Sequence, residues 1–219
     1  MDEIKCIIFD CDGVLVDSEE IGNKVLLSMA KEFGLRMTME EAVMSFSGRS
    51  LKDCFQQIEN RINQKLPTDF EKEYRTQSYE AFKTDLKPVK GVKQFIDSLT
   101  ISYCVASSGP VEKIKSNLTT TGLAEKFGEN IFSSYQINSW KPDPEIFLFA
   151  SREMGFSPRE CIVIEDSKAG VISAIKGGFI VYGFANENNS QVLEDEGAIV
   201  FYSFEELNKL LNTGHNASR

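Results

Sequence analysis

The residues of this sequence most able to do chemistry are four carboxylates, one hydroxyl and one ammonium group, and most of them directly follow apolar runs. They are Asp10, Asp12, Glu165, Asp166, Ser107 and Lys141. Carboxylates that converge are strained unless a cation lies among them. Hard carboxylate oxygens favour Mg²⁺. A magnesium ion together with lysine and serine donors makes a site suited to holding a phosphate.

Each of these signals is weak alone. The bare Asp-x-Asp at 10–12 is more often a solvated turn, and a lone lysine such as Lys141 is more often a surface side chain. The signals become stronger together, because these side chains are predicted to meet at one edge of one sheet. That prediction depends on the strands and helices that carry them.

Four apolar runs predict strands, at 4–9, 101–106, 161–164 and 179–182. Runs that are apolar on both faces suit central parallel strands covered by helices. Helical patterns lie between or beside them, at 92–99, 111–118, 145–154 and 169–175. Strands that alternate with helices predict an α/β fold with a Rossmann-like parallel sheet, in which sites gather at the carboxyl ends of the strands.

Residues 18–85 interrupt this alternation with three apolar helical stripes and no convincing strand. The stripes are Val25, Leu26, Met29 and Phe33, then Leu51, Phe55, Ile58 and Ile62, then Phe70, Tyr74 and the stretch to Phe82. We therefore predict a helical module at 18–85, inserted into a sheet domain formed by 1–17 and 86–219.

The composition excludes several classes of function. The chain has 219 residues and a net charge of −9, which is not the electrostatic footprint of a nucleic-acid binder or of a protein attracted to anionic membranes. No apolar run approaches the length of a membrane span. The single histidine, His215, lies near the C-terminus, so a Ser-His-Asp triad and a histidine-rich zinc site are excluded.

The five cysteines predict buried, reduced thiols, because their number is odd and no two form Cys-x-x-Cys. The acidic N-terminus, which leads directly into a predicted strand, has no signal-peptide pattern. We expect a cytoplasmic protein that is a monomer or a weak homo-oligomer.

Four segments resemble, in order, the four motifs of the haloacid dehalogenase-like phosphotransferases. They are Phe9-Asp10-Cys11-Asp12-Gly13-Val14-Leu15-Val16-Asp17-Ser18, Ala106-Ser107-Ser108-Gly109, Trp140-Lys141-Pro142-Asp143-Pro144 and Glu165-Asp166-Ser167-Lys168-Ala169-Gly170. Any one motif could arise by chance, but four in family order are a strong signal. The helical module is similar to the cap of the β-phosphoglucomutase-like branch. Within it, the chain most resembles bacterial sugar-phosphate phosphatases of the 6-phosphogluconate phosphatase type.

The resemblance implies a role for each core residue. Asp10 would attack phosphorus and form an aspartyl phosphate, and at an ordinary pKa it would need no base to activate it. Asp12 would protonate the leaving alkoxide and then deprotonate the hydrolytic water. Lys141 would offset negative charge on the nucleophile and on the phosphoryl group.

The same resemblance implies the metal and phosphate ligands. Mg²⁺ would be held by Asp10, by the backbone carbonyl of Asp12 and by Asp166, with Glu165 nearby. Ser107 and the backbone N–H groups of Ser108 and Gly109 would bind phosphate oxygens at a helix start.

The cap leaves phosphatase and mutase open. β-Phosphoglucomutases carry a histidine five residues beyond the last aspartate of the first motif, where this chain has Gly22, and the cap-loop arginine, Arg49, is displaced by two residues. Both departures favour hydrolysis. Arg49, Lys52 and Arg75 are candidates for binding the leaving group, and each could equally be a solvated surface cation.

We therefore expect Mg²⁺-dependent hydrolysis of a small phosphorylated metabolite, namely a sugar phosphate or a sugar-acid phosphate such as 6-phosphogluconate. The alternatives are a hexose phosphate mutase and a catalytically silent module that binds a phosphorylated ligand or a protein. Asp12 argues against the dehalogenases and phosphonoacetaldehyde hydrolases of the superfamily, which lack an acid at that position.

Overall fold

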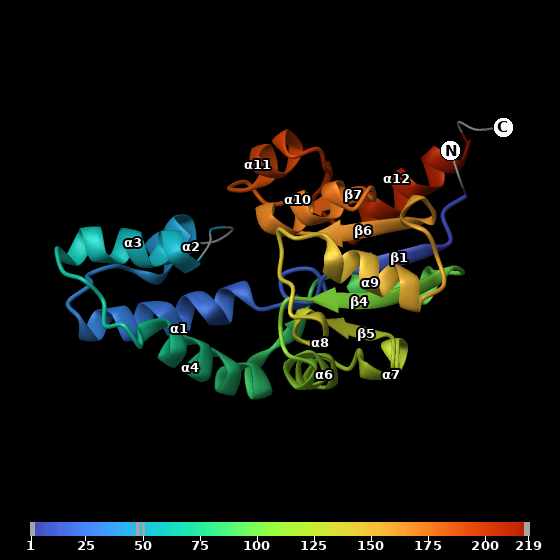
Figure 1. Ribbon diagram of the computed structural model, residues 1–219. Coiled ribbons are helices and arrows are strands. Elements are labelled where there is room, and N and C mark those ends of the chain that lie inside the picture. The colour runs from blue at the N-terminus through green and yellow to red at the C-terminus, as the bar shows by residue number, and fades with distance from the viewer. Residues whose placement is uncertain (1–2, 47–48, 50, 217–219) are drawn as a thin grey trace.

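The structure is a computed structural model that describes residues 3–46, 49 and 51–216 (Figure 1). Its main sheet has six parallel strands in the order β5-β4-β1-β6-β7-β8. They are β1 (Cys6–Phe9), β4 (Ser102–Ser107), β5 (Ile131–Ser133), β6 (Cys161–Glu165), β7 (Ile180–Phe184) and β8 (Ile199–Phe201). Two further strands, β2 (Val16–Asp17) and β3 (Lys87–Pro88), form a separate antiparallel ladder.

Twelve α-helices and one 3-10 helix are found in the described part of the chain. They are α1 (Glu19–Glu32), α2 (Met39–Phe46), α3 (Leu51–Ile62), α4 (Phe70–Asp85), α5 (Val92–Ser98), α6 (Val111–Thr120), α7 (Ala124–Phe127), α8 (Ser134–Ile137), α9 (Glu145–Glu153), η1 (Pro158–Glu160), α10 (Lys168–Lys176), α11 (Ser190–Asp195) and α12 (Phe204–Asn216). Within the described ranges, none of these helices is long and apolar enough to cross a membrane.

The central strand β1 is apolar on both faces because both faces are covered. Ile7 and Phe9 pack into a cluster with side chains of α5, α6, α7 and α12. Cys6 and Ile8 point to the other face, where α9 and α10 supply the packing partners. The alternation along a strand thus places its side chains in two separate cores. The predicted α/β fold with a parallel sheet is confirmed.

The helices α1 to α4 lie beyond the carboxyl ends of the sheet strands, to the left in Figure 1. They enclose an apolar cluster of their own, which includes Leu26, Ile58 and Phe70. The chain enters this helical part after β2 and leaves it before β3, and these two strands pair side by side, with Asp17 opposite Lys87. The ladder falls where the predicted boundaries near 17 and 86 lie.

The remaining differences from the sequence prediction have local causes. The edge strands β5 and β8 were not predicted, because each is only three residues long. α2 was also missed, since its apolar residues are too few to form a stripe. The polar stretch 212–219 predicts a loose tail. This prediction is wrong as far as residue 216, because α12 continues to Asn216.

Candidate active site

The first site residue, Asp10, is fixed by the strand that precedes it. It directly follows β1, its N–H donates to the carbonyl of Ile164 at 2.9 Å, and only 7% of the residue is exposed. The register of β1 with β6 brings Phe9 beside Ile164, so the next residues of β6 come to the same edge. The carboxyl ends of neighbouring strands therefore deliver Asp10 and the acids that follow Ile164 to one place.

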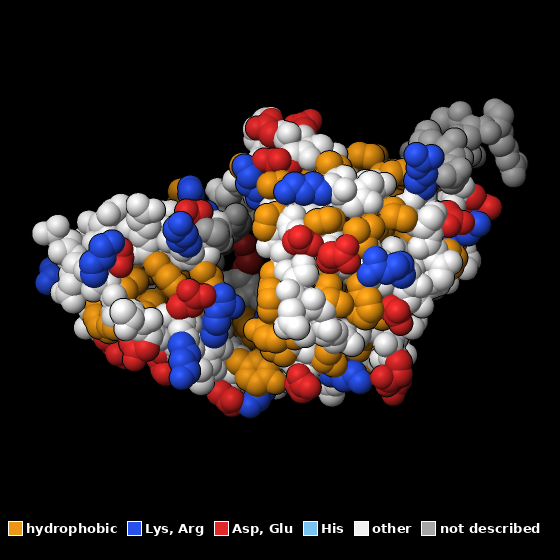
Figure 2. Space-filling model, in the orientation of Figure 1, with side chains coloured by type: hydrophobic (Ala, Val, Ile, Leu, Met, Phe, Trp, Pro, Cys, Tyr) orange, Lys and Arg blue, Asp and Glu red, His pale blue; other side chains and the backbone are white. Residues whose placement is uncertain are grey.

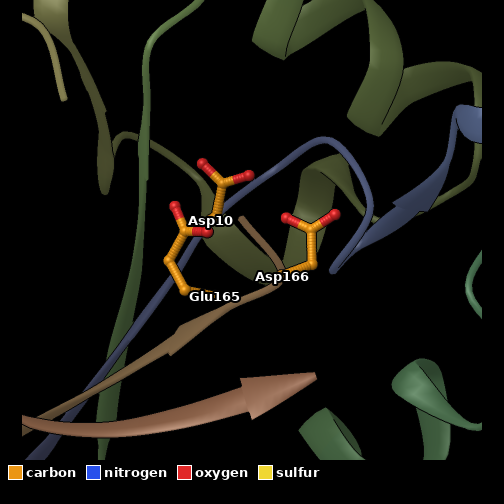
Figure 3. A group of neighbouring side chains, drawn as sticks. All are labelled: Asp10, Glu165 and Asp166. Carbon is orange, nitrogen blue, oxygen red and sulfur yellow. The ribbon is translucent and has the colours of Figure 1, made fainter. Parts of the chain in front are cut away.

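Figure 3 shows Asp10, Glu165 and Asp166 gathered at that edge. One carboxylate oxygen from each lies within 4.8 Å of the others. Gly13 makes the approach of Asp166 possible, because a Cβ at residue 13 would lie 1.9 Å from its Oδ2 atom. Gly13 also has a φ of +85°, which side-chain-bearing residues rarely adopt. The turn after Asp10 is thus shaped to admit the carboxylate of Asp166.

Lys141 supplies positive charge to this group. Its Nζ atom donates to Oδ1 of Asp10 at 2.5 Å and to Oε1 of Glu165 at 2.6 Å. The ammonium also lies 4.8 Å from the centroid of the Phe147 ring. Burial opposes the charge of Lys141, but the two carboxylates outweigh it and raise the pKa of Lys141 above its usual value. The sequence-predicted acids and lysine are therefore brought together.

One lysine does not balance three carboxylates this close together. Burial raises the pKa of Asp10 to about 7, although Lys141 lowers it and Glu165 raises it further. Burial, followed by the charges of Glu165 and Asp10, raises the pKa of Asp166 well above its usual value. The expectation that Asp10 keeps an ordinary pKa is therefore wrong when only groups of the protein surround it. A cation among these oxygens would favour the charged forms, and an all-oxygen donor set suits a hard divalent ion.

Glu165 holds the other groups in place and has little freedom to act as a ligand. Its Oε2 atom accepts from the N–H and the hydroxyl of Ser167 at 2.8 and 2.9 Å, while Oε1 accepts from Lys141. Gly170 makes room for it, because a Cβ there would lie 1.8 Å from Oε1. The donor atoms available to a metal are therefore those of Asp10 and Asp166.

The predicted phosphate cup lies at the end of β4. Ser107 is buried, and its Oγ atom accepts from the N–H of Gly109 at 3.2 Å. Ser133 closes the back of the turn by donating to the carbonyl of Gly109 at 2.6 Å. The helix α6 begins two residues later. Ser107, Ser108 and Gly109 all line the same cavity as Asp10.

Two residues that hold Asp12 were missed by the sequence analysis. Lys113 bonds Oδ2 of Asp12 at 2.5 Å, and Asn117 donates to Oδ1 at 3.1 Å. Burial acts against the charge of Lys113, but attraction to Asp12 raises its pKa. The two lie one helical turn apart on α6, so the signal was a polar pair at i and i+4 after the second motif.

A cavity of about 1130 Å³ extends from these residues to the helices α1 to α4, and the hollow between the two parts is visible in Figure 2. Arg49 and Arg75 line it, whereas Lys52 is exposed on α3 and does not. Arg75 is also exposed, and its guanidinium donates to Oε1 of Glu71 at 2.7 and 3.0 Å. Two of the three predicted cap cations thus face the site.

The fold and the site together define an α/β enzyme with a buried acidic centre, paired with lysine, at the carboxyl edge of its sheet. Residues 7–184 match the model of the haloacid dehalogenase-like hydrolases. The chain belongs to this family, as the four motifs predicted.

Three similar proteins extend this result. A 6-phosphogluconate phosphatase from Escherichia coli is 30% identical, with 96% of each chain covered. A phosphorylated carbohydrates phosphatase from Thermotoga maritima is 29% identical, with 95% of this chain and 98% of the relative covered. The crystal structure of a haloacid dehalogenase-like protein from Agrobacterium tumefaciens has a TM-score of 0.87 and 30% identity, covering 97% of this chain and 99% of that one. The enzyme class that these findings support is a phosphomonoesterase.

Proposed function

We propose that this enzyme hydrolyses a sugar phosphate or sugar-acid phosphate, with Mg²⁺ as cofactor and Asp10 as the nucleophile. The observation that carries the proposal is the buried ion pair of Asp10 with Lys141, close to Asp166, in a cavity large enough for a sugar phosphate. The two similar phosphatases, whose names specify 6-phosphogluconate and phosphorylated carbohydrates, support this class of substrate.

Asp10 and Asp166 would hold Mg²⁺ with the carbonyl of Asp12, and the ion would supply charge for the phosphoryl oxygens. Asp10, paired with Lys141, would attack phosphorus and form an aspartyl phosphate while the bond from phosphorus to the leaving oxygen breaks. Asp12 gives a proton to the leaving alkoxide and takes one from water in the second step. Lys141 stays paired with Asp10 and offsets the charge that develops there.

Hydrolysis is favoured over the mutase and the silent module. A Cβ at residue 22 would lie 2.8 Å from the hydroxyl of Tyr74. With Tyr74 in this position, a histidine side chain does not fit at residue 22. A silent module would not need Asp10 and Lys141 buried against each other. We also propose that residues 18–85 act as a cap over the site and that the enzyme works in a reducing compartment, where its five free, buried cysteines stay thiols.

The test is turnover of p-nitrophenyl phosphate and of a panel of sugar phosphates by the purified protein, before and after dialysis against EDTA. We expect activity that EDTA removes and added Mg²⁺ restores. The Asp10→Asn variant should be inactive and remain folded, because an amide is a poor nucleophile of nearly the same size. Activity in that variant, or in fully metal-depleted protein, would refute the proposed mechanism.

A further inference from the structure

One face of α4 forms a wall of the cavity that leads away from the predicted reacting atoms. Tyr74, Ser78 and Phe82 follow one another at intervals of four residues, and all three line the cavity. The Phe82 ring lies 5.5 Å from Nζ of Lys113, the residue that bonds Asp12. Phe82 therefore marks the Asp12 end of the wall, and Tyr74 stands about 12 Å further along the helix axis.

The Tyr74 side chain is held so that its hydroxyl points across the cavity wall to α1. Its ring packs edge-on against Phe55, with centroids 6.2 Å apart. Its hydroxyl lies over Gly22, where a Cβ would come within 2.8 Å of the oxygen. Burial raises the pKa of Tyr74, so the hydroxyl stays protonated and can both donate and accept a hydrogen bond.

Ser78 lies about one helical turn from Tyr74 on α4. Only 4% of Ser78 is exposed, and its Oγ atom has no hydrogen-bond partner of ordinary geometry within the described ranges. Ser78 nevertheless lies close enough to Tyr74 to oppose the upward effect of burial on the pKa of Tyr74. A buried hydroxyl without a partner is costly. A small movement of the Tyr74 side chain toward Ser78 would let the phenol donate to Oγ, and the phenolic oxygen would keep a lone pair that can accept from a ligand.

We propose that Tyr74 recognises a distal hydroxyl group of a long, polyhydroxylated leaving group, with Ser78 as the residue that positions the phenol. This inference rests on the proposed function for the identity of the reaction. The wall is apolar at Phe82, next to the reacting end, and becomes polar toward its other end, at Ser78 and Tyr74. A three-carbon leaving group held at Asp12 ends before Tyr74, whereas a six-carbon chain reaches it.

The test compares three phosphate esters that separate length from hydroxyl content. Sorbitol 6-phosphate is long and hydroxylated, n-hexyl phosphate is long without hydroxyls, and glycerol 3-phosphate is short. We expect Tyr74→Phe to lower kcat/KM for sorbitol 6-phosphate by about 5- to 10-fold, mainly through KM, because one neutral hydrogen bond is lost. Turnover of the other two esters should change less than 2-fold.

Two further variants separate recognition from general packing. Gly22→Ala places a methyl group 2.8 Å from the Tyr74 hydroxyl, which must then move. Alanine favours a helix, so this variant should fold and show the same selectivity loss. Ser78→Ala should show a smaller loss that disappears in the Tyr74→Phe background, because Ser78 acts through the phenol. Thr84→Val, which removes an exposed hydroxyl elsewhere on α4, is the matched control and should have no effect.

Equal losses on all three esters, or no loss on any, would overturn the inference. Binding of sorbitol 6-phosphate to the Asp10→Asn variant, with and without Tyr74→Phe, tests the contact without turnover. If the wild type hydrolysed no ester while this binding still weakened 5- to 10-fold, the proposed function would fail and the hydroxyl subsite would stand. Unchanged binding would overturn the subsite whatever the activity.

Discussion

At the scale of single residues, the site stores uncompensated negative charge that a cation should relieve. The folded protein keeps the pKa of Asp10 at about 7, whereas an unfolded aspartate titrates near 3.9. Between these values the folded state binds more protons than the unfolded state, so the free energy of unfolding falls as the pH rises. The destabilisation caused by charged Asp10 reaches its full size above about pH 7 and disappears as Asp10 is protonated toward pH 4.

We therefore expect the melting temperature of EDTA-treated protein to fall between pH 5 and pH 8. In a chain of this size, losing 1 kcal/mol of unfolding free energy lowers the melting temperature by about 2–4 °C. We expect the fall to be larger than that. Saturating Mg²⁺ should flatten the curve, because it favours the charged carboxylates. Asp166→Asn, which removes one buried charge, should flatten it without metal. A melting temperature that rises with pH in EDTA would contradict this assignment.

Lys113 offers a second prediction at this scale, because it bonds Asp12, the carboxylate that we propose as the general acid. Lys113→Met should leave Asp12 poorly oriented and lower kcat for alkyl phosphates about 10-fold, which is a part of the roughly 100- to 10,000-fold that general acid catalysis contributes. Turnover of p-nitrophenyl phosphate should fall less, since nitrophenolate leaves without a proton. Lys115→Met, on the exposed side of the same helix, is the control. An equal loss on both substrates would assign Lys113 to phosphate binding instead.

At the scale of elements, the turn between β1 and β2 depends on a glycine for two reasons that can be separated. Gly13 and Gly34 both have positive φ angles, +85° and +92°. A Cβ at residue 13 would meet Asp166, whereas at residue 34 it would meet nothing within 4 Å. Gly13→Ala should therefore abolish activity, while Gly34→Ala should cost about 1 kcal/mol of stability from backbone strain and keep activity. Kinetics and thermal melts of both variants decide this, and an active Gly13→Ala enzyme would contradict it.

The strands of the sheet could be predicted from the sequence better than the helix faces that line the cavity. The buried strands β1, β4 and β6 were found because continuous apolar runs ended at polar residues, and their parallel order then placed Asp10, Ser107 and Glu165 together. Residues such as Asn117 and Tyr74 could not be assigned, since their roles depend on which helix face turns toward the cavity. The start of α2 had a local signal that was overlooked, a capping box in which Thr38 and Glu41 bond each other's backbone N–H groups.

At the scale of the whole molecule, the cavity lies between two parts of the chain, the sheet edge on one side and α1 to α4 on the other. In the proposed mechanism the reacting groups lie at the sheet edge, where they would not reach the far end of a long leaving group. Selection must therefore come from α1 to α4, where Arg49 and Arg75 line a cavity in a chain of net charge −9. Arg75 is paired with Glu71 on an exposed helix surface, so exchanging that partner for a substrate carboxylate costs little.

This arrangement predicts a selective loss on acidic substrates. Arg49→Ala or Arg75→Ala should lower kcat/KM for 6-phosphogluconate by about 30- to 150-fold, the equivalent of roughly 2–3 kcal/mol for a charged hydrogen bond buried on closure. Activity on p-nitrophenyl phosphate should stay within a few-fold of wild type, because that leaving group has no carboxylate. Lys52→Ala, outside the cavity lining, is the matched control. Equal losses on both substrates would mean that the arginines act in cap closure or folding, and no loss on either would leave them as solvated surface cations.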